Sequence, residues 1–145
     1  GEGEVRITAA DKSAQEDART LRWTGNGTSW AGLVGDSSID LQREANGQLS
    51  LALDYRLDAP LNATVSLRIG CGAGCGGSVP IGPPLTSSAA GQWAHLKIPL
   101  ACFAKSGADL SRVTIPFAID SADHTTVSVA NIRLESGTDG VMSCR

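Results

Sequence analysis

The feature of this sequence that most constrains its fold is a series of short segments in which apolar and polar residues alternate. This alternation has the period of a half-buried β-strand and not the 3.6-residue period of an amphipathic helix. Residues 63–69 show it after a turn at residues 58–60, and we expect them to form a hairpin with residues 48–57. Residues 48–57 are the clearest segment, with one face made of Leu49, Leu51, Leu53, Tyr55 and Leu57.

The remaining segments of this kind predict an all-β protein. Pro80, Pro83 and Pro84 confine their stretch to edge strand or coil, and residues 102–107 suggest a short helical turn. About eight strands are enough for a jelly-roll β-sandwich of two antiparallel sheets, and 145 residues are enough for one domain spanning residues 1–145. Further strands are expected at residues 5–9, 20–23, 29–34, 91–100, 113–119 and 125–134.

Charge and hydropathy exclude two classes of partner. The 15 acidic and 12 basic residues give a net charge of −3, without the clustered Lys and Arg that bind nucleic acid. The uncharged apolar runs fall far short of the roughly 20 residues that cross a bilayer. We therefore expect neither a nucleic-acid nor a membrane partner. Because the sequence begins with Gly1 rather than Met, we also expect an excised piece or a mature product.

Four cysteines indicate the compartment. A zinc site is the alternative to disulfides, but Cys71 and Cys75 have no second ligand pair at a matching spacing. Of the three possible pairings we favour Cys71–Cys75 across the glycine loop, with Cys102–Cys144 holding the tail. A bond between Cys75 and Cys102 in a non-reducing peptide map would overturn this choice. Oxidised cysteines imply a periplasmic or secreted protein.

The sequence contains no arrangement typical of catalysis. His95 and His124 have no adjacent activated Ser or Cys, and we interpret both as solvated. The carboxylate pairs that a glycosidase could use fall in polar, turn-like segments, where backbone capping is the expected role. These pairs are Glu16/Asp17, Asp36/Asp40 and Asp120/Asp123.

Calcium is the metal that competes with this interpretation. Asp11, Glu16, Asp17, Asp36 and Asp40 lie in the early loops, and calcium prefers carboxylate and carbonyl oxygens. No Asp-x-Asp-x-Asp-Gly loop supports such a site, so we expect no cofactor, with calcium as the alternative.

Aromatic residues supply the candidate sugar-binding site. Tyr55 and Phe117 alternate with core positions, and Trp93 is expected to cover one end of the core. Sugars bind β-sandwich modules by stacking on exposed aromatic faces beside polar groups that fix the hydroxyls. The candidate carbohydrate-binding residues are Trp30, Trp23 and Arg22, beside the turn at residues 24–27.

Several motifs resemble known carbohydrate-active proteins. The segment from Gly91 to Phe103, with Pro116-Phe117 and residues 131–134, looks like the closing half of galactose-binding-like jelly rolls. More closely, residues 71–77, 99–103, 107–113 and 116–117 resemble the C-terminal domain of bacterial family 3 glycoside hydrolases of the exo-1,3/1,4-β-glucanase type. Residues 15–19 and 40–47 fit the same family, so the likeness covers most of the chain.

The resemblance implies a non-catalytic accessory domain of a β-glucosidase or exo-β-glucanase, with the catalytic residues in preceding domains. Such a domain would dock on the catalytic domains, stabilising them or shaping the rim of the active site. The alternative is an independent carbohydrate-binding module for β-glucans. Many relatives of this fold hold calcium with an acidic residue before the last Ile-x-Leu, where this sequence has Asn131.

Overall fold

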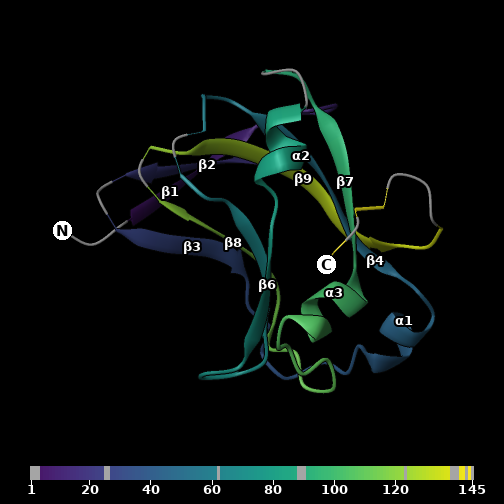
Figure 1. Ribbon diagram of the computed structural model, residues 1–145. Helices are drawn as coiled ribbons and strands as arrows, with labels where there is room; N and C mark the ends of the chain where they lie inside the picture. Colours follow the sequence, from purple (N-terminus) through teal and green to yellow (C-terminus); the bar gives the residue numbers. More distant parts are fainter. Residues whose placement is uncertain are drawn as a thin grey trace.

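The computed structural model of the protein describes residues 4–24, 27–61, 63–87, 91–122, 124–137, 141–142 and 144. These residues contain nine strands and three short helices (Figure 1). The strands are β1 (Glu4–Ala10), β2 (Ala18–Thr24), β3 (Thr28–Leu33), β4 (Ser50–Leu57), β5 (Ser66–Gly70), β6 (Gly76–Pro80), β7 (Ala94–Pro99), β8 (Ile115–Ala122) and β9 (Thr126–Glu135). The helices are α1 (Gln42–Asn46), α2 (Gly82–Ser87) and α3 (Leu100–Lys105).

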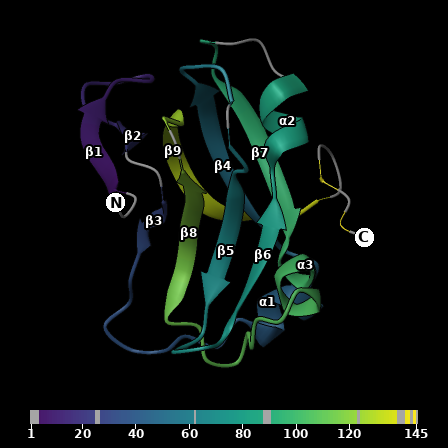
Figure 2. The same cartoon turned by 60° about the vertical axis from the view of Figure 1, so that its left-hand side comes forward.

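The strands form two antiparallel sheets. The five-stranded sheet has the order β1-β2-β9-β4-β7, and the four-stranded sheet has the order β3-β8-β5-β6. Figure 2 shows the four-stranded sheet with β3, β8, β5 and β6 side by side. Most neighbours within a sheet are distant in sequence, as in a jelly roll. The structure therefore confirms the predicted jelly-roll sandwich, with β6 as an added strand that ends at Pro80 on the sheet edge.

The predicted hairpin between residues 48–57 and 63–69 is wrong. β4 pairs with β7 and β9, whereas β5 lies in the other sheet between β8 and β6. Apolar and polar residues alternate in both strands because each strand turns one face toward the core. The two strands lie on opposite sides of that core. The link over residues 58–65 is longer than a tight hairpin loop, and it carries the chain from one sheet to the other.

The stretch around Pro83 and Pro84 also differs from the expected edge strand or coil, because it forms helix α2. Both prolines lie in the first turn of this helix, where the missing N–H would have no partner inside the helix. Leu85 of α2 is fully buried, and the Tyr55 hydroxyl donates a hydrogen bond of 2.9 Å to the Pro84 carbonyl. Helix α2 thereby closes the core beside β4.

The core fills the space between the two sheets. The predicted face of β4 is buried there from Leu51 to Leu57, opposite Leu67 and Ile69 of β5. Tyr55 and Phe117 are core residues, as predicted. None of the described helices is long and apolar enough to cross a membrane.

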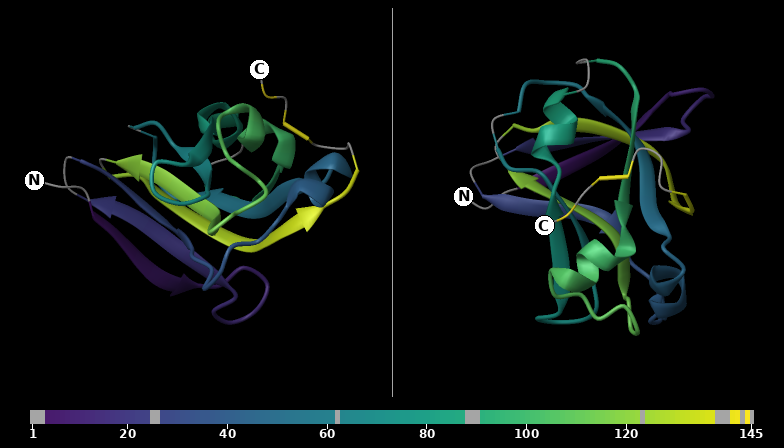
Figure 3. Two further views of the ribbon diagram at one scale, coloured as in Figure 1. Left: turned by 90° about the horizontal axis from the view of Figure 1, so that it is seen from below. Right: turned by 45° about the vertical axis from the view of Figure 1, so that its right-hand side comes forward.

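Two disulfides follow the favoured pairing. Cys71 and Cys75 close a five-residue loop with a Cα–Cα distance of 5.0 Å. Cys102 of α3 bonds to Cys144 with a Cα–Cα distance of 5.8 Å. Val141 of the terminal segment forms a parallel bridge with Lys97 of β7, and Figure 3 shows this segment beside β7, between α2 and α3. Val141 and Met142 therefore contact the outer edge of β7 at Lys97.

The two sides of the sandwich are closed in different ways. On the side of β6 and β7, helices α2 and α3 pack against the sheet edges (Figure 2). On the other side lie the edge strands β1 and β3, where Ile7 and Leu33 are 56 % and 51 % exposed. Apolar side chains therefore reach solvent on the side that these helices do not cover.

Candidate carbohydrate-binding site

The outer face of the four-stranded sheet brings one predicted residue, Trp30, together with an ion pair. Trp30 of β3 lies directly across from Asp120 of β8, which lies across from Ser66 of β5. The Arg68 Nε atom donates to Asp120 Oδ2 at 3.1 Å, and its guanidinium lies 5.1 Å from the centre of the Trp30 ring. Three strands that are distant in sequence thus contribute to a single array.

Small residues allow this array to form. Gly32 and Arg68 both pair with Ala118 of the central strand β8, so Arg68 must reach across Ala118 to contact Trp30. Ala118 has no exposed surface, although it lies in register with these outward-facing residues. A Cβ atom on Gly32 would lie 2.2 Å from the Phe117 carbonyl oxygen. Glycine is therefore needed where β3 approaches β8.

The exposed ring is suited to a sugar. Trp30 is 40 % exposed, and it is the only exposed Trp, Tyr or Phe side chain among the described residues. An indole face can stack on the C–H face of a pyranose, while a guanidinium and a carboxylate beside it can bind neighbouring hydroxyls. Because Arg68 and Asp120 neutralise each other, the array suits an uncharged ligand.

The structure separates Trp30 from the other two predicted binding residues. Trp23 has no exposed surface, and its indole N–H donates to the Ser29 carbonyl at 3.1 Å. Trp23 is therefore a core residue, and its prediction as a ligand platform is wrong. Arg22 is exposed, but it lies on the outer face of the five-stranded sheet, because successive strand residues point to opposite faces.

Arg68 is the functional candidate that the sequence analysis missed, and Asp120, which was expected to cap a turn, is its partner on β8. The alternation of residues 66–69 could have placed Arg68 on an outer face, because Leu67 and Ile69 point inward. Its partner could not be found in the same way, since strand pairing is not visible in a single sequence. The carboxylate pair Asp120/Asp123, for which backbone capping was expected, is not described as a pair, because Asp123 lies outside the described residues.

Trp93 and His95 belong to a separate polar network on the outer face of the five-stranded sheet. The predicted cover of the core by Trp93 is not found, because Trp93 is not among the residues that pack against the core. The Arg56 guanidinium lies 5.1 Å from the Trp93 ring centre, and Lys12 lies 5.8 Å away. His95 Nδ1 lies 3.0 Å from Asp54 Oδ1, and His95 Nε2 lies 3.5 Å from Glu135. His95 is partly exposed, but it has ionic partners rather than water alone.

The Asp54 carboxylate is held ionised by this network. Partial burial by itself raises the pKa of Asp54, but hydrogen bonds from Asn131 and His95 and the charge of Arg133 outweigh it. The net pKa of Asp54 is therefore below its ordinary value. Asn131 Nδ2 donates to Asp54 Oδ2 at 2.8 Å, so the residue before the last Ile-x-Leu is used inside the protein.

Carboxylates of the loop between β1 and β2 bind the protein's own backbone. Asp17 accepts hydrogen bonds from the backbone N–H groups of Lys12, Ser13 and Ala14, which lower the pKa of its carboxyl group. Asp11 accepts one from Glu16. Among the described residues, no group of three His, Cys, Asp or Glu is placed to hold a metal. These carboxylates close the loop between β1 and β2, and we derive no role for calcium.

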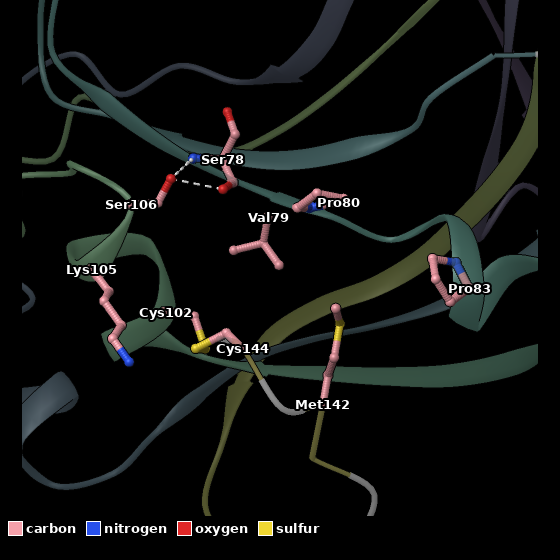
Figure 4. Close-up of a pocket in the computed structure, with 9 residues that line it drawn as sticks. All are labelled: Ser78, Val79, Pro80, Pro83, Cys102, Lys105, Ser106, Met142 and Cys144. Carbon is pink, nitrogen blue, oxygen red and sulfur yellow. Dashed lines mark hydrogen bonds between the residues drawn. A yellow bond between two sulfur atoms is a disulfide. The ribbon is translucent and has the colours of Figure 1, made fainter.

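Figure 4 shows a hollow that lies between β6, α2, α3 and the terminal segment. It has a volume of about 490 Å³, and its walls include the Cys102–Cys144 disulfide and Met142. The Ser106 hydroxyl donates to the Ser78 carbonyl at 2.8 Å and accepts from the Ser78 N–H at 3.0 Å. These two bonds use main-chain groups on the outer edge of β6. The described lining residues of this hollow include no aromatic side chain on which a sugar could stack.

A smaller, apolar groove lies on the open side of the sandwich. It has a volume of about 180 Å³ and runs between β1 and β3, with Arg19 at its rim. Its lining comes from both sheets and consists mainly of Ile7, Leu21, Ala31, Leu33, Phe117, Val129 and Ile132.

Comparison with known proteins places this fold among carbohydrate-active enzymes and their modules. The exo-1,3/1,4-β-glucanase ExoP of a Pseudoalteromonas species superposes with a TM-score of 0.76 at 19 % identity, covering 97 % of this chain but only 17 % of the enzyme. The extra C-terminal domain of ExoP gives 0.72 at 18 % identity, with 100 % and 83 % of the two chains covered. A family 30 carbohydrate-binding module of a Clostridium thermocellum cellulosomal cellulase gives 0.68 at 22 % identity, with 94 % and 87 % covered.

These similarities extend to the fold of almost the whole chain. No curated protein matches the sequence significantly. The structural neighbours share the fold, and two of them are an extra enzyme domain and a carbohydrate-binding module. The sequence itself matches the Exop_C family, described as galactose-binding domain-like, over residues 1–134. The chain therefore belongs to the Exop_C family of galactose-binding domain-like domains.

Proposed function

We propose that the domain binds a β-glucan chain on the outer face of its four-stranded sheet. It does so as an accessory module of a periplasmic or secreted β-glucosidase or exo-β-glucanase. The observation that carries the proposal is the exposed Trp30 ring beside the Arg68–Asp120 ion pair. The similarity to an exoglucanase domain and to a carbohydrate-binding module supports the same ligand class. Two disulfides support an oxidising compartment.

Titration calorimetry with laminarin, mixed-linkage glucan and cello-oligosaccharides tests the proposal. Loss of one aromatic stacking contact costs about 1–2 kcal/mol, so Trp30→Ala should weaken binding about five- to thirtyfold. Arg22→Ala is the matched control, because Arg22 lies on the other sheet and should leave the affinity unchanged. Absence of binding heat for all three glucans at millimolar concentrations refutes a sugar-binding role.

A second candidate function, docking on the catalytic domains of the parent hydrolase, is favoured by the groove between β1 and β3. Its apolar lining and the exposed Ile7 and Leu33 side chains are suited to burial against another protein surface. A volume of about 180 Å³ is enough for one large apolar side chain of the partner.

Docking can be tested in the full-length enzyme. Ile7→Lys should lower its melting temperature and its turnover of oligosaccharides, because a charge would enter the apolar contact. Thr8→Lys is the matched control, since Thr8 is exposed and points to the opposite face of β1. If deletion of the whole domain left stability and turnover unchanged, docking would be excluded.

A further inference from the structure

The four edge strands of the sandwich differ in how their outer edges are protected. The edge of β6 is occupied by the Ser106 hydroxyl at Ser78, and it ends at Pro80, which has no N–H. The edge of β7 is occupied in its middle by the bridge from Lys97 to Val141, and the strand ends at Pro99. Native proteins use such covers, prolines and charges to prevent a further strand from adding to a sheet.

The two remaining edges lie on the same side of the molecule, and only one of them carries charge. β1 contains Glu4 and Arg6. β3 contains neither charge nor proline, and its uncharged run continues through Val34 and Gly35. Four of its six residues are exposed, and Val34 beyond it is 66 % exposed. Within the described residues, β3 is thus the edge strand with the least protection against pairing.

We propose that a second copy of this chain pairs antiparallel along the free edge of β3 and completes the sugar-binding face with its own Trp30. The sugar-binding half of this statement rests on the function proposed above, whereas the pairing does not. A strand that adds to a sheet edge satisfies main-chain groups, and a two-fold axis makes both edges equivalent.

The sequence of β3 is complementary to itself about Ala31. A two-fold axis at this residue places Trp30 of one copy opposite Gly32 of the other, so the largest side chain meets a residue without one. The same register places Ser29 opposite Leu33, and no charged residues face each other. Each exposed Leu33 side chain would then be partly covered by the strand of the other copy. This complementarity favours a second copy over an unrelated strand.

Pairing would change the sugar-binding face. Arg68 reaches Trp30 from the β5 side, so it does not stand between Trp30 and the free edge. The two Trp30 side chains would be diagonal neighbours, about 7–8 Å apart, on one eight-stranded face. Two rings of one glucan chain could then stack on two indoles. A domain with one exposed aromatic would acquire a platform of two.

Sedimentation velocity of the intact domain from about 10 μM to about 1 mM tests the pairing, in a range where weak dimers are measurable. We expect a reversible dimer whose dissociation constant rises at least about tenfold in Leu33→Lys, because edge lysines oppose strand addition. Thr8→Lys, which places the same charge on the other open edge, is the control and should dimerise like the parent. Thermal melts establish that both variants are folded.

Each outcome decides between the alternatives. A monomer throughout the concentration range, or an equal effect of Thr8→Lys and Leu33→Lys, overturns pairing along β3 even if laminarin binds. A dimer whose laminarin affinity is the same in Leu33→Lys overturns the shared platform but not the pairing. A dimer that binds no glucan refutes the sugar-binding function alone. Pairing along β3 would cover the groove between β1 and β3, so a dimer and a docked catalytic domain would compete for it. If added catalytic domains left the dimer dissociation constant unchanged, docking through this groove would be excluded.

Discussion

Removal of each disulfide in turn should reveal how much the protein depends on the size of the loop that each one closes. Cys71 and Cys75 are 4 residues apart in sequence, whereas Cys102 and Cys144 are 42 apart. In both pairs one cysteine is buried and its partner is partly buried. Replacement by alanine therefore removes comparable packing from each site, and the two variants differ mainly in loop length.

The loop lengths give the expected magnitudes. The entropy of closing a loop in the unfolded chain gives about 4 kcal/mol for the Cys102–Cys144 bond and about 2 kcal/mol for the Cys71–Cys75 bond. For a domain of this size, these losses correspond to a fall in melting temperature of about 12 °C and about 6 °C. Cys102→Ala/Cys144→Ala should thus be the less stable variant.

Urea unfolding at pH 7, followed by tryptophan fluorescence and by circular dichroism, measures both free energies. Coincidence of the two signals establishes a two-state transition in each variant. Equal losses, or a larger loss for Cys71→Ala/Cys75→Ala, would refute the dependence on loop length. They would show that local packing at each bridge decides its contribution.

Three further substitutions test the packing and the charges. Gly77→Ala should destabilise the domain by more than about 2 kcal/mol in urea unfolding, because the added Cβ would lie 2.1 Å from the Phe103 carbonyl oxygen. An unchanged midpoint would show that β6 can move away from α3. Ser106→Ala should cost about 1–2 kcal/mol through its two lost bonds to Ser78, and wild-type stability would mean that water replaces them. Because its pKa is lowered on folding, Asp54 contributes stability that is present above about pH 4 and is lost as the pH falls through its folded value. Asp54→Asn should therefore reduce the stability difference between pH 7 and pH 3, and an unchanged difference would contradict the lowered pKa.

The sequence was sufficient for the strands but not for their partners. Alternation in β4 and β5 correctly predicted the buried face of each strand, because period-2 patterning depends only on the local pleat. It could not show that β4 and β5 belong to different sheets, since both bury the same kind of face. The cysteine pairing was within reach because few geometries satisfy the short loop at Cys71.

The candidate site was predicted less completely for a related reason. Trp23 and Trp30 flank the same turn, and the residues around them in the sequence do not show which indole is buried and which is exposed. The separation comes from long-range packing, which covers Trp23 and leaves Trp30 beside Arg68. Asp120 joins the site only because β8 lies between β3 and β5. Such a contact depends on strand order, which alternation within one strand does not specify.

The Cys102–Cys144 bond also determines what happens when a protease cuts the domain. The covalent ring that it closes contains β8 and β9, the strands that occupy inner positions in the two sheets. A single nick at the exposed turn near His124 would separate β8 from β9 in sequence, yet both pieces would stay linked through the bond. β8 would also remain paired in the four-stranded sheet, and β9 would remain paired in the five-stranded sheet. The domain would thus stay assembled after such a cut until the bond is reduced.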